Sequence, residues 1–372
     1  MRNGSEHFET VIIGGGQAGL ATGYHLARRN RRFVILDANQ RVGDNWRCHW
    51  DSLRLYSPAR YDGLPGMPFP ASPWSYPTKD DVAEYLAAYA ARFDLPVRNG
   101  VRADALSRDG DRYVITYGDR SIEADNVVVA TGTFGRTPYL PGFATELDPG
   151  IVQLHSGEYR NPSQLRPGGV LVVGASHSGS DIAHEVAASH EAILCGRDTG
   201  QVPFRLESRL ARAIFPVLWF VWTRILTVKT PMGRKLRPEV RAHGGPLLRV
   251  KRADLAAAGV ERVEARVSGV RHGRPLLDDG RVLDVTNVVW CTGFRQDFDW
   301  IRIPVIGDDG WPLEQRGVVA SSPGLYFTGL SFQHSFSSML VGGAGRDAEH
   351  IVEHIDAHMS KDRPVGAASA SR

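Results

Sequence analysis

The stretch that most constrains the fold is a glycine turn close to the start of the chain. The apolar run 10–13 predicts a buried strand and leads directly into this turn, after which 20–27 has helical spacing. A second apolar run, 32–36, ends at Asp37, whose carboxylate would accept hydrogen bonds from a ribose. The turn therefore predicts a bound nucleotide, with an ordinary α/β turn as the alternative. The three positions of the dinucleotide-binding fingerprint are filled by Gly14, Gly16 and Gly19.

The same pattern recurs in the middle of the chain. The apolar run 170–173 leads into a second glycine turn, a helix and another apolar run, 192–195. Ser176 replaces the middle glycine, which narrows the approach of a phosphate without closing it. Arg197 stands where the first unit has its acid, 23 residues after the first glycine in both units (14 to 37, 174 to 197). Because a basic group there accommodates a ribose 2′-phosphate, this unit predicts NADPH; an arginine merely exposed at a loop tip is the alternative.

In each unit a later apolar strand leads into a Thr-Gly pair, at 131–132 in the first unit and at 292–293 in the second. A strand late in the chain is predicted to return to the first sheet. A helix over 345–358 follows it. These elements predict an α/β protein with two Rossmann-like dinucleotide-binding domains, the second inserted in the first. We expect the first domain to occupy residues 1–150 and to resume over 296–359. The inserted second domain spans 151–295, with a helical apolar segment at 203–250, and a disordered tail covers 360–372.

Composition excludes several classes of protein. The chain has 372 residues, of which 44 are basic and 41 acidic, so the net charge of +3 implies no nucleic-acid partner. Three widely spaced cysteines form neither a C-x-x-C pair nor a zinc pattern, so no metal site is expected. This cysteine usage favours a reducing compartment, and with a polar N-terminus it predicts a cytoplasmic protein.

One segment, 213–228, is strongly apolar and lies between basic residues. It is shorter than a bilayer-spanning helix and contains Pro216 and Arg224. Trp219 and Trp222 beside basic residues suit a helix that lies in a membrane interface. The alternative is an apolar cap packed over the active site or against a second subunit. Membrane-surface contact and oligomerisation therefore both stay open.

Two such units, with a long irregular loop between Trp46 and Thr78, resemble the flavin-containing monooxygenases. Within that family the chain is most similar to the bacterial single-chain members and the plant YUCCA-type enzymes, over nearly its whole length. The resemblance implies FAD on the first unit and NADPH on the second. It also implies oxygen transfer from a C4a-hydroperoxyflavin to a small organic substrate, with O₂ as co-substrate. The most specific stretches are 43–47, 64–70, 76–78, 85–86, 89–90, 174–183 and 291–294.

The chain departs from the family pattern in its identifying motif. His155, Tyr159 and Arg160 match that motif, whereas Pro149 and Ile151 occupy its phenylalanine and glycine positions. The motif is therefore half present. A second departure, Tyr56 at about the place of an asparagine near the flavin in animal members, means that oxygenation of amine drugs at nitrogen or sulfur is not implied for this chain.

The resemblance also indicates site residues. Tyr56 stands at about the place where animal members have an asparagine near the flavin, so it is the catalytic candidate. Trp46 is expected to wall the flavin, Trp50 to be core, and His334 to contact flavin or substrate or to be structural. Substrate contacts are expected from the loops between Trp50 and Tyr76 and from 203–250. The residues expected to bind the cofactors are Gly14, Gly16, Gln17, Ala18, Gly19, Asp37, Gln40, Trp46, Thr131, Gly132, Gly174, Ser176, Ser178, Gly179, Arg197, Thr292 and Gly293.

Two further functions remain beside that of an NADPH-dependent monooxygenase. A flavin-dependent NADPH dehydrogenase or reductase would share the fold without inserting oxygen, although the missing C-x-x-C argues against disulfide chemistry. A non-catalytic nucleotide-binding protein would show bound nucleotide and negligible flavin reduction.

Overall fold

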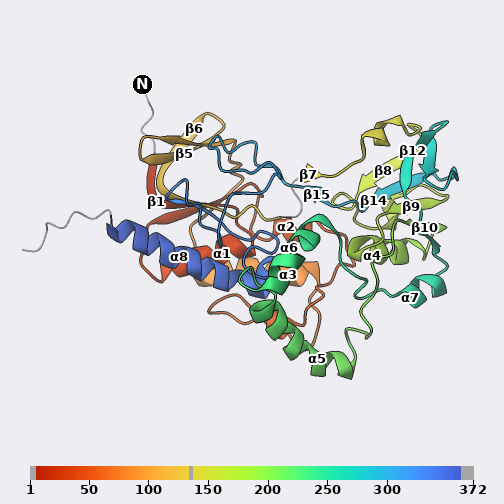
Figure 1. Cartoon of the computed structure of the whole chain (residues 1–372), viewed down its shortest axis with the longest axis horizontal. Coiled ribbons are helices and arrows are strands. Elements are labelled where there is room, and N and C mark those ends of the chain that lie inside the picture. Colours follow the sequence, from red (N-terminus) through yellow and green to blue (C-terminus); the bar gives the residue numbers. More distant parts are fainter. Residues whose placement is uncertain (1–5, 134–136, 362–372) are drawn as a thin grey trace, which may run out of the picture.

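Two sheets, one mixed and one wholly parallel, organise the chain in a computed structural model that describes residues 6–133 and 137–361 (Figure 1). The strands of the first sheet are β1 (Glu6–Ile13), β2 (Phe33–Asp37), β3 (Val97–Asn99), β4 (Ala105–Asp109), β5 (Arg112–Tyr117), β6 (Arg120–Val129) and β16 (Leu325–Phe327). Their order is β3-β2-β1-β6-β5-β4, with β16 also paired to β6. The first three, β6 and β16 run parallel, whereas β4 and β5 form an antiparallel edge.

Helices cover one face of this sheet. They are α1 (Gln17–Ala27), α3 (Lys79–Arg92) and α8 (Ala344–Lys361). α1 and α8 lie side by side, and their apolar residues share a core with Tyr85 and Tyr89 of α3 (Figure 1). α3 begins at Lys79, because the Thr78 hydroxyl accepts from the Asp81 N–H at 3.1 Å while the Asp81 carboxylate accepts from the Thr78 N–H at 2.8 Å.

The second sheet is wholly parallel, with the order β11-β10-β9-β14-β8. Its strands are β8 (Val152–His155), β9 (Val170–Val173), β10 (Ala192–Cys195), β11 (Glu261–Val263) and β14 (Asn287–Trp290). Every residue of β9 and β14 is buried, as expected for apolar strands covered on both faces. α4 (His177–Val186), α7 (Arg252–Ala257) and the hairpin of β12 (Val267–Arg271) and β13 (Arg274–Leu277) complete this unit.

The chain crosses between the two sheets at a short antiparallel pair, β7 (Thr137–Pro138) with β15 (Phe294–Arg295) (Figure 1). The apolar segment forms α5 (Arg209–Phe220), a π-helical turn at Val221–Ile225 and then α6 (Pro231–Ala242). Among the described residues, no helix combines the length and the apolar character needed to cross a bilayer.

The predicted fold class is confirmed, and β16 returns to the first sheet as expected. One predicted boundary differs in the structure. α8 continues to Lys361, because Met359 still packs against the core, so Ser360 belongs to the helix. The predicted tail from 362 onward lies outside the described residues.

Candidate functional site: two glycine turns facing one crossing

The first glycine turn has no room for side chains at two of its positions. Gly14 has a φ of +117°, and a Cβ there would lie 2.4 Å from the Ala130 carbonyl oxygen. A Cβ at Gly19 would lie 1.9 Å from the Gly14 carbonyl oxygen, so this glycine lets α1 pack directly on β1. A Cβ at Gly16 would meet only the Asn45 amide nitrogen, at 3.4 Å. The backbone is therefore open on the side where a pyrophosphate is expected.

The start of α1 fits the same ligand. Its N-cap, Gly16, supplies no side-chain hydrogen bond, so the first turn, with Gln17 and Ala18, keeps N–H groups for phosphate oxygens. The Gln17 side-chain oxygen accepts from the Trp46 indole N–H at 3.4 Å, which brings α2 (Asp44–Arg47) beside this turn. Ala18 is buried at the same turn.

A buried carboxylate lies at the end of the second strand of the first unit. Asp37 ends β2 at 4 % exposure, and burial raises its pKa. The Asn39 backbone and side-chain N–H groups both donate to its Oδ1, at 3.0 and 2.9 Å, and favour the charged form. A Cβ at Gly15 would lie 2.4 Å from Oδ2, so this oxygen lies against the glycine turn. Gln40 is exposed three residues further on. This arrangement fits the ribose of a nucleotide whose phosphates lie on the turn.

The second glycine turn repeats this geometry. Gly174 has a φ of +110°, with 2.3 Å between a Cβ there and the Cys291 carbonyl oxygen. A Cβ at Gly179 would lie 1.7 Å from the Gly174 carbonyl oxygen, as in the first unit. The N–H of the first glycine donates to the strand beside it at 2.8 Å in both turns. Ser178 lies in the first turn of α4, half-buried.

A loop of the chain itself lies over this second turn. The Ser176 hydroxyl donates to the Gly245 carbonyl oxygen at 2.8 Å, and a Cβ at Gly244 would meet the same hydroxyl at 2.5 Å. A Cβ at Gly245 would lie 3.0 Å from the ring of His177. Gly244 and Gly245 therefore lie against the start of α4, and a side chain at either position would require Ser176 or His177 to move.

Arg197 lies beside the same turn. It is exposed and follows Gly196, where a Cβ would lie 3.4 Å from the Ala175 backbone nitrogen. Among the described residues, no carboxylate lies within ion-pair distance of Arg197. Its guanidinium is therefore free to meet an anionic group at the rim of the turn.

The two Thr-Gly turns both lie near the crossing between the sheets. The Thr292 hydroxyl donates to the Tyr139 carbonyl oxygen, and the Gly293 carbonyl oxygen accepts from the His155 ring at 2.9 Å. Thr131 and Gly132 follow the end of β6, and a Cβ at Gly132 would meet nothing within 4 Å. All four residues are half-buried at the junction of the units.

The catalytic candidate Tyr56 connects the two units. Its hydroxyl donates to Oδ2 of Asp181 in α4 at 2.8 Å, and its ring lies 5.2 Å from that of His177. Burial raises the pKa of Tyr56 well above its ordinary value and raises that of Asp181 to about 6. The Tyr56 hydroxyl is thus already engaged by a carboxylate. Of the other predicted residues, Trp50 is core as expected, and His334 is buried with no partner for Nδ1 among the described residues.

Sequence reasoning missed Asp62. The side chain is fully buried, the Ser57 hydroxyl donates to Oδ1 at 2.6 Å, and Oδ2 has no partner among the described residues. Burial raises the pKa of Asp62 to about 8. The sequence did contain an indication of this burial, because Asp62 is the single acidic residue in the apolar, proline-rich stretch 58–70.

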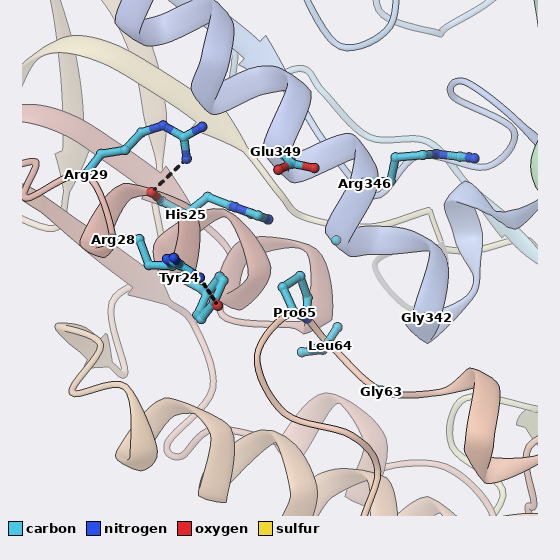
Figure 2. Close-up of a pocket in the computed structure, with 11 residues that line it drawn as sticks. Tyr24, His25, Arg28, Arg29, Gly63, Leu64, Pro65, Gly342, Arg346 and Glu349 are labelled. Atoms are coloured by element: carbon cyan, nitrogen blue, oxygen red, sulfur yellow. Dashed lines mark hydrogen bonds between the residues drawn. The ribbon is translucent and has the colours of Figure 1, made fainter. Parts of the chain in front are cut away.

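A cavity of about 740 Å³ lies away from both glycine turns (Figure 2). It is lined by the second half of α1, by the loop 63–65 and by the first turns of α8. Figure 2 shows Arg346 turned away from His25, and its guanidinium donates instead to the Thr223 carbonyl and Ser335 hydroxyl oxygens. None of the predicted cofactor residues lines this cavity. It is therefore separate from the candidate site.

Two glycine turns of one geometry in a single chain are typical of oxidoreductases that bind two dinucleotides. The family model of the pyridine nucleotide-disulphide oxidoreductases matches residues 11–213. The chain is 37 % identical to a CzcO-like oxidoreductase of Geobacillus kaustophilus, over 94 % of this chain and 99 % of that protein. It is 28 % identical to the probable indole-3-pyruvate monooxygenase YUCCA7 of Arabidopsis thaliana, over 93 % and 86 %.

A solved structure agrees with these relatives. The flavin-containing monooxygenase of Stenotrophomonas maltophilia is 27 % identical, with a TM-score of 0.74 over 95 % of this chain and 99 % of that one. The chain belongs to the pyridine nucleotide-disulphide oxidoreductase family, and within it to the flavin-dependent oxidoreductases that include the flavin monooxygenases.

Proposed function

We propose that this protein is an NADPH-dependent FAD monooxygenase that oxygenates a small organic substrate with O₂. The observation that carries the proposal is the pair of matching glycine turns, one followed by a buried acid, Asp37, and the other by an exposed base, Arg197. The two relatives named as monooxygenases support the oxygenating branch of the family over a plain reductase.

FAD is assigned to the first unit, residues 1–150 and 296–359. The open side of Gly16 and the uncapped start of α1 would hold its pyrophosphate, and the Asp37 carboxylate its adenosine ribose. Trp46, fixed beside the turn by its hydrogen bond to Gln17, would wall the flavin. Thr131 and Gly132 would approach the cofactor where β6 ends.

NADPH is assigned to the second unit, residues 151–295. The start of α4 would hold its pyrophosphate, and Arg197 would bind the 2′-phosphate through charge-assisted hydrogen bonds. The contact between Ser176 and Gly245 lies on the path of the pyrophosphate, so the 244–245 loop must adjust when the nucleotide binds. Tyr56 enters the proposal as a positioning residue, since its hydroxyl is engaged by Asp181 and holds its loop against α4.

The bound flavin would supply hydride acceptance from NADPH and activation of O₂. The chain would supply orientation and the exclusion of water, for which the aromatic loops between Trp50 and Tyr76 and the segment 203–250 are placed. The Tyr76 hydroxyl donates to the Leu206 carbonyl oxygen at 2.5 Å, which ties these two stretches together. Amines, sulfides and 2-oxo acids are the substrate classes to screen, and the YUCCA relatives favour the last.

Rapid mixing tests this proposal. Purified protein is reduced anaerobically with NADPH and then mixed with oxygen, while the absorbance spectrum is followed. A transient band distinct from oxidised and reduced flavin is expected before reoxidation, together with slow NADPH oxidation that accelerates with substrate. Reduction followed by direct reoxidation, with full turnover of an artificial acceptor without oxygen, would establish a dehydrogenase instead. A protein that binds nucleotide but is never reduced would have no redox role.

A further inference from the structure

The outer face of α5 carries apolar side chains that nothing in the described structure covers. Leu210, Val217 and Phe220, together with Met232 at the start of α6, are each between 57 and 62 % exposed. Ala213 is exposed on the same helix. The positions 210, 213, 217 and 220 follow the spacing of one helical face, so they form a continuous stripe. We call these four residues of α5 the α5 stripe.

The opposite face of the same segment is firmly packed. Phe215 and Trp219 lie 4.9 and 5.0 Å from the ring of Tyr61, and Trp222 lies 5.3 Å from Phe336. These aromatic contacts on the inner face fix the orientation of the helix, so the α5 stripe faces outward. Scattered exposed apolar residues are normal on soluble proteins, whereas a contiguous stripe marks a surface that meets something apolar.

The segment that carries the stripe is strongly basic, between Glu207 at one end and Glu239 at the other. From Ser208 to Pro238 the chain contains no aspartate or glutamate, and it contains seven basic residues. They are Arg209, Arg212, Arg224, Lys229, Arg234, Lys235 and Arg237. Among the described residues, only Arg237 of this set has a carboxylate within ion-pair distance, that of Glu314 at 2.7 Å. The others leave their positive charge to an external partner.

We infer that the α5 stripe and its basic flanks dock on the surface of an anionic phospholipid bilayer. An apolar helical face rimmed by unpaired cations is the pattern that inserts to the depth of the headgroups, where apolar side chains leave water and cations meet lipid phosphates. A second copy of this chain fits less well, because two such faces would bring twelve unpaired positive charges together (six on each copy). Because only one face of the helix is apolar, the protein lies on the bilayer surface without crossing it, and its binding is reversible.

Vesicle co-sedimentation of the full-length flavin-loaded protein tests this inference. The vesicles are phosphatidylcholine alone or phosphatidylcholine mixed with phosphatidylglycerol. We expect partition into the mixed vesicles at low salt, little into the neutral ones, and release as salt rises. The double variant V217E/F220E should lower the partition coefficient by about tenfold or more. R209Q/R212Q should lower it on mixed vesicles only.

The matched control is V282E/L313E, which places the same charges on two exposed apolar residues outside the segment. It should sediment like the unchanged protein. Bound flavin and the thermal midpoint are measured for every variant, so that unfolding is not mistaken for lost docking. The inference is overturned if the unchanged protein ignores both vesicle types. It is equally overturned if V217E/F220E abolishes a dimer in solution without changing vesicle binding, since the stripe would then be a subunit interface.

Discussion

The Tyr56 hydroxyl donates a 2.8 Å hydrogen bond to Oδ2 of Asp181 and so joins the loop of the first nucleotide unit to α4, the helix that follows the second glycine turn. The Arg249 guanidinium lies 5.8 Å from the centre of the Tyr56 ring and donates to the Leu55 carbonyl oxygen at 2.7 Å. Three separate stretches therefore meet at one partly buried polar contact, close to the second glycine turn. The relative position of the two nucleotide units depends in part on this contact.

Replacing Tyr56 by phenylalanine should destabilise the protein by about 1–3 kcal/mol, because Asp181 keeps its burial and loses its donor. The free energy of unfolding in urea at neutral pH measures this loss. Tyr139→Phe is the control, since the Tyr139 ring is partly exposed and its change should stay within about 0.5 kcal/mol. Equal losses in the two variants would show that the contact with Asp181 contributes nothing specific.

Arg197→Ala should weaken NADPH binding far more than NADH binding. The difference between the binding free energies of the two nucleotides should shrink by about 1–3 kcal/mol. The reason is that only NADPH carries the 2′-phosphate that this exposed side chain would meet. The dissociation constants for both nucleotides measure the effect. Arg271→Ala, at an exposed arginine of the same unit, should leave both unchanged. If Arg197→Ala weakened both nucleotides alike, the phosphate role would be wrong.

Gly16→Val should give a folded protein that purifies without yellow colour. A Cβ at Gly16 has an ordinary contact at 3.4 Å, so the backbone has room for the branch point of a side chain there, whereas a pyrophosphate bound on the turn would clash with that side chain. Flavin absorbance and circular dichroism are measured together. The control is Gly269→Val, at a position where a Cβ meets nothing within 4 Å. Retention of flavin by the Gly16 variant would refute the assignment of FAD to this turn.

Asp62→Asn should flatten the pH dependence of stability. Burial raises the pKa of Asp62 from 3.8 to about 8, so between these values the folded protein holds a proton that the unfolded chain has lost. The free energy of unfolding therefore falls as pH rises through this window, by up to about 1.4 kcal/mol per pH unit from this group. The variant cannot ionise and should lose this slope. Urea midpoints between pH 5 and about pH 8 measure it, and parallel curves for the two proteins would contradict the assignment.

Local pattern predicted much of the fold because the glycine turns are local structures. Gly14 and Gly19 contact each other across five residues of sequence, so their spacing alone determines a close strand–helix contact. The buried strands β9 and β14 were also predictable, because both faces of a parallel sheet demand continuous apolar runs. The end of α8 was less accurate, because its last turn is held by the packing of Met359 against the core, a contact that the local pattern does not indicate.

The sequence by itself determined two nucleotide turns, their order, and the acid and base that follow them, because these features depend on residues close together in the chain. Only the tertiary structure decided that Tyr56 meets Asp181, that Gly245 covers Ser176, and that Asp62 is buried. The first two pairs are separated by 125 and 69 residues. The exposure of the α5 stripe was settled in the same way, because an apolar helix has no local feature that tells which face the rest of the protein will cover.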